Sequence, residues 1–234
     1  MRKIVLASTS TLSGQEYLAY LEPAIRELFA GIPELVFIPY ARPGGISHDD
    51  YTARAAAAFG NWGIKVKGLH TFKDPEVAIR HAAGYFTGGG NTFLLVKQLH
   101  EQKLMDLLAA EVEGGKPYLG TSAGSNIGGV NMQTTNDMPI VYPSSFQTMN
   151  LVPFNLNPHY LDPLPDSGHM GETRETRIRE FHTQQQVPVV GLREGSWIEV
   201  KGTEIALRGP LSARIFKAGH EPYEMAPGGN LSLI

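Results

Sequence analysis

The chain has 234 residues, of which 42% are hydrophobic and 18% charged, with a formal net charge of −3 at pH 7. This composition is typical of a folded globular protein and gives no sign of a nucleic-acid partner or a membrane surface. The sequence has no cysteine, which excludes disulfides, a thiolate nucleophile and zinc held by cysteine. The apolar run near Met1 is too short for a signal peptide, so we expect a cytoplasmic protein.

The first 130 residues alternate between short apolar runs and longer amphipathic ones, which predicts strands alternating with helices. The predicted strands are Lys3–Ala7, Leu35–Pro39, Ile64–Leu69, Tyr85–Thr87 and Pro117–Leu119. The predicted helices are Ser13–Ala30, Asp49–Trp62, a helix capped by Asp74, Asn91–Leu99 and Leu104–Glu113. Pro23 should kink or divide the first of these helices.

The second half contains shorter strand candidates that are typical of β-hairpins. They are Val187–Leu192, Ser196–Val200, Glu204–Leu207 and Arg214–Phe216. Alternating strands and helices predict an α/β fold with a mainly parallel, doubly wound sheet, and the hairpins would extend that sheet antiparallel. We expect residues 1–234 to form one domain, with its ligand site at the carboxyl ends of the strands.

The most informative motif is Gly120-Thr121-Ser122-Ala123-Gly124, which follows a predicted strand. A serine between two glycines in this frame is typical of a nucleophile elbow, a tight turn from strand into helix. The Ser122 hydroxyl would then stand exposed, and the Ala123 N–H would face a developing oxyanion. The alternative is a glycine-rich loop in which the serine only caps a helix.

A second glycine cluster, Gly88-Gly89-Gly90, also lies between a predicted strand and a predicted helix. The sequence that follows matches neither a dinucleotide fingerprint nor a P-loop. We therefore expect this cluster, at Gly90 above all, to supply a second oxyanion donor. A tight turn with close helix packing is the alternative.

A serine nucleophile needs a base, and His159 is the best placed of the eight histidines. It leaves a strand-like segment and enters a long polar loop, whereas His70 and His169 are weaker candidates. The base in turn needs an orienting carboxylate. Asp137 lies in a polar turn after the Ser122 helix, and Glu194 lies at the end of a predicted strand. Spacing alone does not choose between them.

Two further groups of polar residues could bind a ligand or a metal ion. A charged helix is predicted at Glu172–Phe181, directly after the His159 loop. Arg174 in its first turn could point into the site, where its guanidinium could hold a carboxylate with two parallel hydrogen bonds. The acidic and histidine side chains around that loop could also be metal ligands, although their spacing matches no metalloenzyme frame. These are His159, Asp162, Asp166, His169 and Glu172.

These segments and several others make the chain resemble the peptidase E family, the α-aspartyl dipeptidases among the serine peptidases that are related to cyanophycinase. The segments that carry the resemblance recur in the family's order over most of the chain. They are Gly88–Phe93, Ser122–Gly124, Thr134–Val141, Asn157–His159, Gly171–Glu175 and Glu194–Gly195 before Trp197.

The resemblance implies a fold like that of class I glutamine amidotransferases, which is flavodoxin-like, with a serine in the place of the cysteine. It implies Ser122 as nucleophile and His159 as base, with Glu194 favoured over Asp137 as the third member. It also implies that Arg174 binds the aspartate side chain of Asp-X dipeptides and that Asn91 contacts substrate.

Two departures from the family pattern are visible. Thr121 stands where the family commonly has tryptophan, and the Tyr160–Gly168 loop differs in length and composition. The expected chemistry is acyl transfer through an ester on Ser122, with no cofactor and no partner beyond a small peptide, in a monomer or small homo-oligomer. A cyanophycinase-like hydrolase, a lipase-type esterase and a non-catalytic anion-binding domain remain alternatives.

Overall fold

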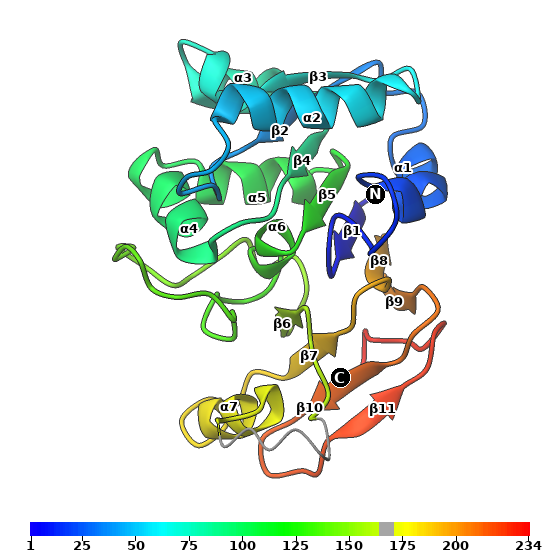
Figure 1. Ribbon diagram of the computed structural model, residues 1–234, viewed down its shortest axis with the longest axis vertical. Helices are drawn as coiled ribbons and strands as arrows, with labels where there is room; N and C mark the ends of the chain where they lie inside the picture. The colour runs from blue at the N-terminus through cyan, green and yellow to red at the C-terminus, as the bar shows by residue number, and fades with distance from the viewer. Residues whose placement is uncertain (164–170) are drawn as a thin grey trace.

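The computed structural model describes residues 1–163 and 171–234, and they form two β-sheets with helices around them (Figure 1). The larger sheet has seven strands in the order β3-β2-β4-β5-β1-β8-β9. Its strands are β1 (Lys3–Ala7), β2 (Glu34–Ile38), β3 (Lys65–Gly68), β4 (Tyr85–Thr87), β5 (Tyr118–Thr121), β8 (Trp197–Lys201) and β9 (Glu204–Arg208). The first five are parallel, and β8 and β9 extend the sheet antiparallel from β1.

Helices cover both faces of this sheet, which confirms the predicted doubly wound α/β arrangement. On one face, α1 (Glu22–Leu28) and α2 (His48–Gly60) bury Ile25, Tyr51 and Phe59 against the strands. The other face packs against α3 (Pro75–His81), α4 (Thr92–Glu101), α5 (Met105–Glu113) and α6 (Ala123–Asn126). Apolar burial on both faces explains why β1 and β2 are continuous apolar runs without alternation.

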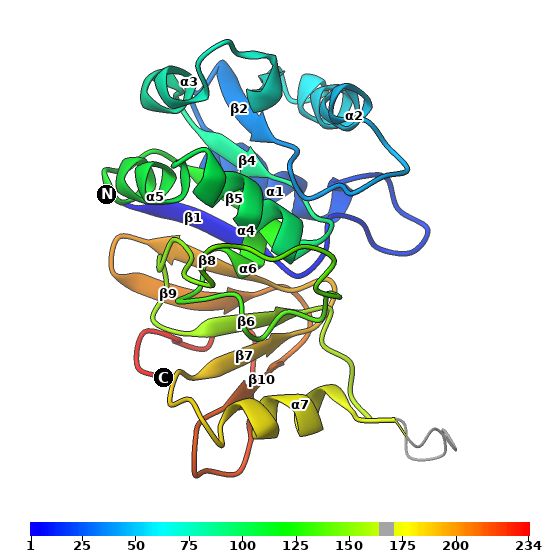
Figure 2. The same cartoon turned by 90° about the vertical axis from the view of Figure 1, so that its left-hand side faces the viewer.

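The smaller sheet has four strands in the order β11-β10-β7-β6. Its strands are β6 (Asn155–Pro158), β7 (Val189–Leu192), β10 (Ala213–Phe216) and β11 (Tyr223–Met225). Helix α7 (Arg174–Phe181) packs on it through Ile178 (Figure 2). The prediction that the late strands would extend the same sheet is therefore wrong for β7 and β10, because β7 pairs with β6 and β10 and not with the larger sheet.

The first predicted helix is also shorter than expected. The region from Ser13 to Leu18 is not helical, and only a short 3-10 turn, η1 (Ala19–Leu21), precedes α1. Leu18 has a left-handed φ of 64°, and Pro23 lies in the first turn of α1, where its missing N–H costs nothing. Pro23 thus begins a helix rather than kinking one.

Within the described residues, the helices are too short or too polar for any of them to cross a membrane.

Candidate active site

The strand-to-helix turn at Ser122 is tightly constrained. Ser122 follows β5 directly and caps α6 with φ 53° and ψ −111°, a conformation that non-glycine residues rarely adopt. A Cβ on Gly120 would collide with the Gly124 carbonyl, and a Cβ on Gly124 would collide with the Thr87 carbonyl. Both glycines of the motif are therefore required by close backbone approach, as the nucleophile-elbow interpretation expects.

His159 reaches Ser122 from the smaller sheet. It follows the last residue of β6, and its Nε2 lies 2.9 Å from the Ser122 Oγ. Its own φ is 53°, and its backbone N–H donates to the Ser8 Oγ at 2.9 Å. The Ser8 hydroxyl in turn donates to the Leu192 carbonyl at 2.7 Å, so one hydroxyl at the end of β1 fixes the ends of β6 and β7 together.

Glu194 lies on the far side of the imidazole from Ser122. In the parallel pair of β6 and β7, Pro158 is opposite Leu192, so the residues that follow both strands emerge side by side. The Glu194 Oε1 lies 2.5 Å from the His159 Nδ1. The His159 and Glu194 side chains are 38% and 48% exposed, so a substrate can reach this line of three groups from solvent.

Asp137, the alternative orienting carboxylate, binds elsewhere. Its Oδ2 accepts hydrogen bonds from the Thr92 N–H at 2.7 Å and from the Thr135 hydroxyl at 3.0 Å. It therefore lies at the N-terminus of α4, where a negative charge is favourable. In the described part of the chain, the carboxylate that bonds His159 is that of Glu194.

The glycine loop lies against the Ser122 side chain. A Cβ built on Gly89 would lie 3.0 Å from the Ser122 Cβ, which places the glycine loop directly against the serine. Gly90 has a φ of 146°, and a Cβ there would collide with the Ala41 carbonyl. Among the described residues, no acceptor takes the N–H of Gly90 or of Ala123. Both amides can therefore donate to an oxyanion.

Arg174 and Asn91 both lie near the Asp137 segment. Arg174 is the first residue of α7, half-buried, and has no ion-pair partner among the described residues. Burial and the neighbouring Arg177 lower the pKa of Arg174, while Asp137 acts in the opposite direction. The Asn91 side chain caps α4 through the Leu94 N–H and donates to the Met138 carbonyl at 2.9 Å. Its expected contact with substrate stays a prediction.

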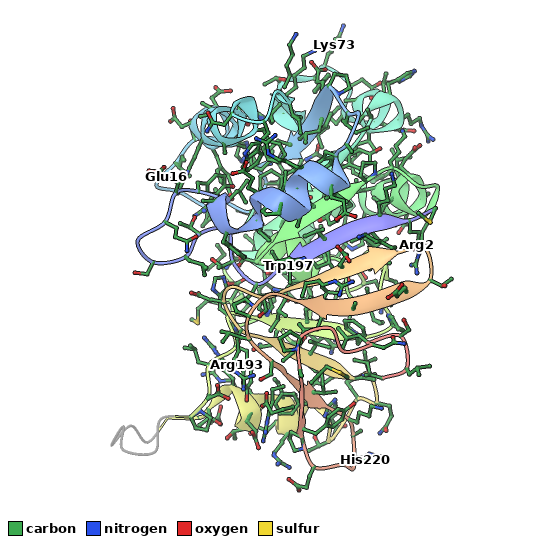
Figure 3. All side chains as sticks on the ribbon, turned by 90° about the vertical axis from the view of Figure 1, so that its right-hand side faces the viewer. Arg2, Glu16, Lys73, Arg193, Trp197 and His220 are labelled. Atoms are coloured by element: carbon green, nitrogen blue, oxygen red, sulfur yellow. The ribbon has the colours of Figure 1, made fainter. Side chains whose placement is uncertain are left out.

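The sequence did not point to two residues that support the site, Ser8 and Arg193. Ser8 gives no signal beyond its place after β1. Arg193 precedes Glu194 at the edge where β7 ends (Figure 3). Its guanidinium binds Asp162 through two hydrogen bonds of 2.8 and 2.7 Å and Glu224 through two of 2.8 and 3.0 Å. Arg193 thereby joins the segment after His159 to β11.

The other candidate residues have different surroundings. Asp162 is paired with Arg193, Glu172 with Arg177, and the His70 Nε2 with Asp49 at 2.8 Å. Asp166, His169 and part of the Tyr160–Gly168 loop lie outside the described residues. Within the described residues, no three histidine or acidic side chains gather in a way that could hold a metal ion.

The comparisons with known proteins agree with this geometry. Residues 4–208 match the model of peptidase family S51. Peptidase E of Streptomyces coelicolor is 46% identical over 98% of this chain and 93% of its own length. A Drosophila melanogaster protein named "Probable alpha-aspartyl dipeptidase" is 44% identical over 100% of this chain and 97% of its own length.

A solved structure supports the fold. The crystal structure of a peptidase from an acI-B1 actinobacterium superposes with a TM-score of 0.73 and 17% sequence identity, covering 99% of this chain and 96% of that chain. At this identity the likeness concerns the fold alone. The family match and the two relatives cover nearly the whole chain, and on that basis the protein belongs to peptidase family S51.

Proposed function

We propose that the protein is a serine-type dipeptidase that hydrolyses Asp-X dipeptides through an acyl-enzyme on Ser122. The observation that carries the proposal is the continuous hydrogen-bonded line from the Ser122 Oγ through His159 to Glu194. Nucleophile, base and orienting carboxylate in this order are the arrangement that acyl transfer from a peptide requires. Family membership and the names of the relatives support the reaction class.

In the first half-reaction, the His159 Nε2 takes the Ser122 proton as Oγ attacks the peptide carbonyl carbon. The carbonyl oxygen becomes an oxyanion, which accepts hydrogen bonds from the N–H groups of Ala123 and Gly90. The C–N bond then breaks, and His159 gives its proton to the leaving amine. Water, deprotonated by His159, attacks the ester and releases aspartate, so that Ser122 recovers its proton.

Glu194 and the oxyanion donors have separate roles in this scheme. Glu194 accepts from the His159 Nδ1–H, which holds the tautomer whose Nε2 is free to take a proton. The amides of Ala123 and Gly90 act where charge develops, and losing one such donor typically lowers the rate by about 10²–10³-fold. No step of this scheme requires a cofactor. We further propose that the chain forms one α/β domain and that it acts on small peptides in the cytoplasm.

Arg174 would select aspartate as the first residue. A half-buried guanidinium without a carboxylate partner on the described chain is poorly solvated, and a substrate carboxylate would restore its ion pair. A neutral asparagine side chain would leave it unpaired. Charge-assisted hydrogen bonds are worth about 1.5–3 kcal/mol, so Asp-X should be preferred over Asn-X by roughly 10–150-fold.

The test compares kcat/KM for Asp-Leu and Asn-Leu in the wild type and in Arg174→Met. We expect efficient cleavage of Asp-Leu, insensitive to a chelator, and a preference over Asn-Leu that nearly disappears in the variant. Arg177→Met, on the same helix but exposed, is the matched control and should keep the preference. A wild type that cleaves both peptides equally would contradict the assignment of Arg174, and one that cleaves neither would contradict the dipeptidase.

A further inference from the structure

A second group of cationic side chains lies in a part of the chain far from Arg174 in sequence. Arg42 lies in the segment between β2 and α2, and Arg54 lies on α2. Figure 2 shows this segment and the start of α7 at opposite ends of the edge where the parallel strands terminate, with α6 between them. Every other arginine except Arg174 has a carboxylate partner.

Both guanidinium groups stack on tyrosine rings. The Arg42 Cζ lies 4.6 Å from the centre of the Tyr51 ring, and the Arg54 Cζ lies 4.5 Å from that of Tyr17. Stacking holds the plane of a guanidinium but leaves its N–H edges available to a planar anion. Among the described residues, neither arginine has a carboxylate within ion-pair distance.

The interior of this group also has unused donors. The Arg42 Nε and the Tyr17 hydroxyl are buried and have no hydrogen-bond partner in the described part of the chain. Burial raises the pKa of Tyr17 well above its usual value, and the Tyr51 hydroxyl, which lies close by but outside regular hydrogen-bond geometry, acts in the same direction, so the Tyr17 hydroxyl keeps its proton. Buried donors without partners are uncommon, because each loses its hydrogen bonds to water. A bound anion would satisfy both.

A short chain of contacts connects this group to Ser122. Gly89 lies against the Ser122 side chain, and its carbonyl accepts from the Tyr51 hydroxyl at 3.2 Å. Arg42 stacks on that same Tyr51 ring, and the Ala41 carbonyl before it accepts from the Asn91 N–H at 2.7 Å. Only the glycine loop and one tyrosine ring therefore separate Arg42 from the serine.

We propose that Arg42, assisted by the Tyr17 hydroxyl, binds the free α-carboxylate of the leaving residue. This inference rests on the proposed dipeptidase function and adds the second anchor of the substrate. The terminal carboxylate of a dipeptide lies one residue beyond the scissile bond, a span of about 3.8 Å between successive Cα atoms. An Asp-X dipeptide carries two carboxylates, and an arginine on each side of Ser122 would accept one of them.

Such an anchor would limit the enzyme to dipeptides. In a longer or amidated peptide, a neutral amide takes the place of the terminal carboxylate. Arg42 would then remain without an anionic partner, and binding in the transition state would weaken. Because charge-assisted pairing is lost, we expect the wild type to prefer Asp-Leu over C-terminally amidated Asp-Leu by about tenfold or more in kcat/KM.

The experiment measures kcat/KM for Asp-Leu and for amidated Asp-Leu in the wild type, Arg42→Met, Arg42→Lys and Tyr17→Phe. In Arg42→Met the ratio of kcat/KM for Asp-Leu to that for amidated Asp-Leu should fall to about one. The change should come from a lower kcat/KM for Asp-Leu alone. Arg42→Lys should keep part of the preference, and Tyr17→Phe should lower it by about two- to fivefold. Arg26→Met, an exposed partner of Glu22 on α1, is the control and should keep it in full.

The outcomes separate this inference from the function on which it rests. A wild type that cleaves both substrates equally well would overturn the carboxylate anchor while leaving the dipeptidase intact. An Arg42→Met variant that cleaves both more slowly but keeps their ratio would also overturn it. A wild type that cleaves neither would overturn the proposed function itself. The wild-type comparison needs no variant, so a failure of Arg42→Met to fold leaves the proposal testable.

Discussion

The two sheets of this protein differ in what each contributes to the site. The larger sheet is buried by helices on both faces, and it supplies Ser122 at the end of β5, a strand enclosed by β4 and β1. The smaller sheet has four strands, and it supplies His159 and Glu194 at the ends of β6 and β7. In the proposed mechanism, the nucleophile therefore comes from one sheet, and the base with its carboxylate comes from the other.

This division has a physical reason. Ser122 occupies a strained backbone conformation, which costs of order 1–3 kcal/mol and persists only where the surroundings fix it. The enclosed strand and its close glycine contacts provide such surroundings. His159 and Glu194 need relative alignment, and the parallel register of β6 and β7 provides it. Ion pairs of Arg193 then brace the outer side of the smaller sheet.

The largest expected effect tests the larger sheet's contribution. In Ser122→Ala we expect kcat for Asp-Leu to fall by about 10⁴-fold or more, because the proposed nucleophile is lost. The fold should remain, because the helices and strands do not depend on the hydroxyl. Circular dichroism and the melting temperature check this. In Ser122→Gly activity should be lost equally, but the melting temperature should rise, because glycine tolerates the positive φ. An active Ser122→Ala variant would contradict the proposal that the larger sheet supplies the nucleophile.

The next effect tests the smaller sheet's carboxylate. Glu194→Gln should lower kcat by about 10²–10⁴-fold, because an amide can hold His159 in the wrong tautomer. Asp137→Asn should change kcat by less than about tenfold, since its carboxylate bonds the Thr92 N–H and Thr135 and not His159. The two variants are isosteric controls for one another. A loss of kcat in Asp137→Asn alone would reverse the assignment.

The smallest effect concerns the bracing of the smaller sheet and appears in stability at low pH. Hydrogen bonds from Arg193 lower the pKa of Glu224 to about 2, from an ordinary value of 4.5. This carboxylate therefore stabilises the fold fully above pH 4.5, and its contribution is lost as the pH falls toward 2. Its side chain is 41% exposed, so solvent screening reduces the contribution to about 1–2 kcal/mol.

Urea unfolding between pH 2 and pH 7 measures this contribution. In Glu224→Gln the free energy of unfolding at pH 7 should be lower than in the wild type, and the difference should vanish near pH 2. Glu204→Gln, on the exposed start of β9, is the control and should follow the wild-type curve. Identical curves for Glu224→Gln and the wild type would show that this ion pair does not brace the sheet.

Much of the larger sheet could be predicted from the sequence. Its strands are buried on both faces, so they are short continuous apolar runs, and caps such as Asp74 mark where helices begin. The smaller sheet was harder to predict, because which strand pairs with which depends on contacts between residues far apart in the chain. The pairing of β6 with β7 joins segments more than thirty residues apart, and no local pattern encodes it.

The same contrast holds within the candidate site. Ser122 lies in a motif whose glycines are needed locally, so a single segment was enough to find it. The choice between Glu194 and Asp137 depended on which of two turns lies beside His159, and only the strand register gives that. Ser8 was missed because a serine after a strand is common, and the two hydrogen bonds of its hydroxyl connect it to residues 151 and 184 positions away.

The Ser8 hydroxyl makes the His159 amide proton a local reporter of whether the two sheets stay together. That proton can exchange with deuterated water only when the hydrogen bond to Ser8 opens. If it exchanges faster than the amides within β1 and β6, the seam between the sheets separates before either sheet unfolds. Heating would then abolish turnover several degrees below the melting temperature.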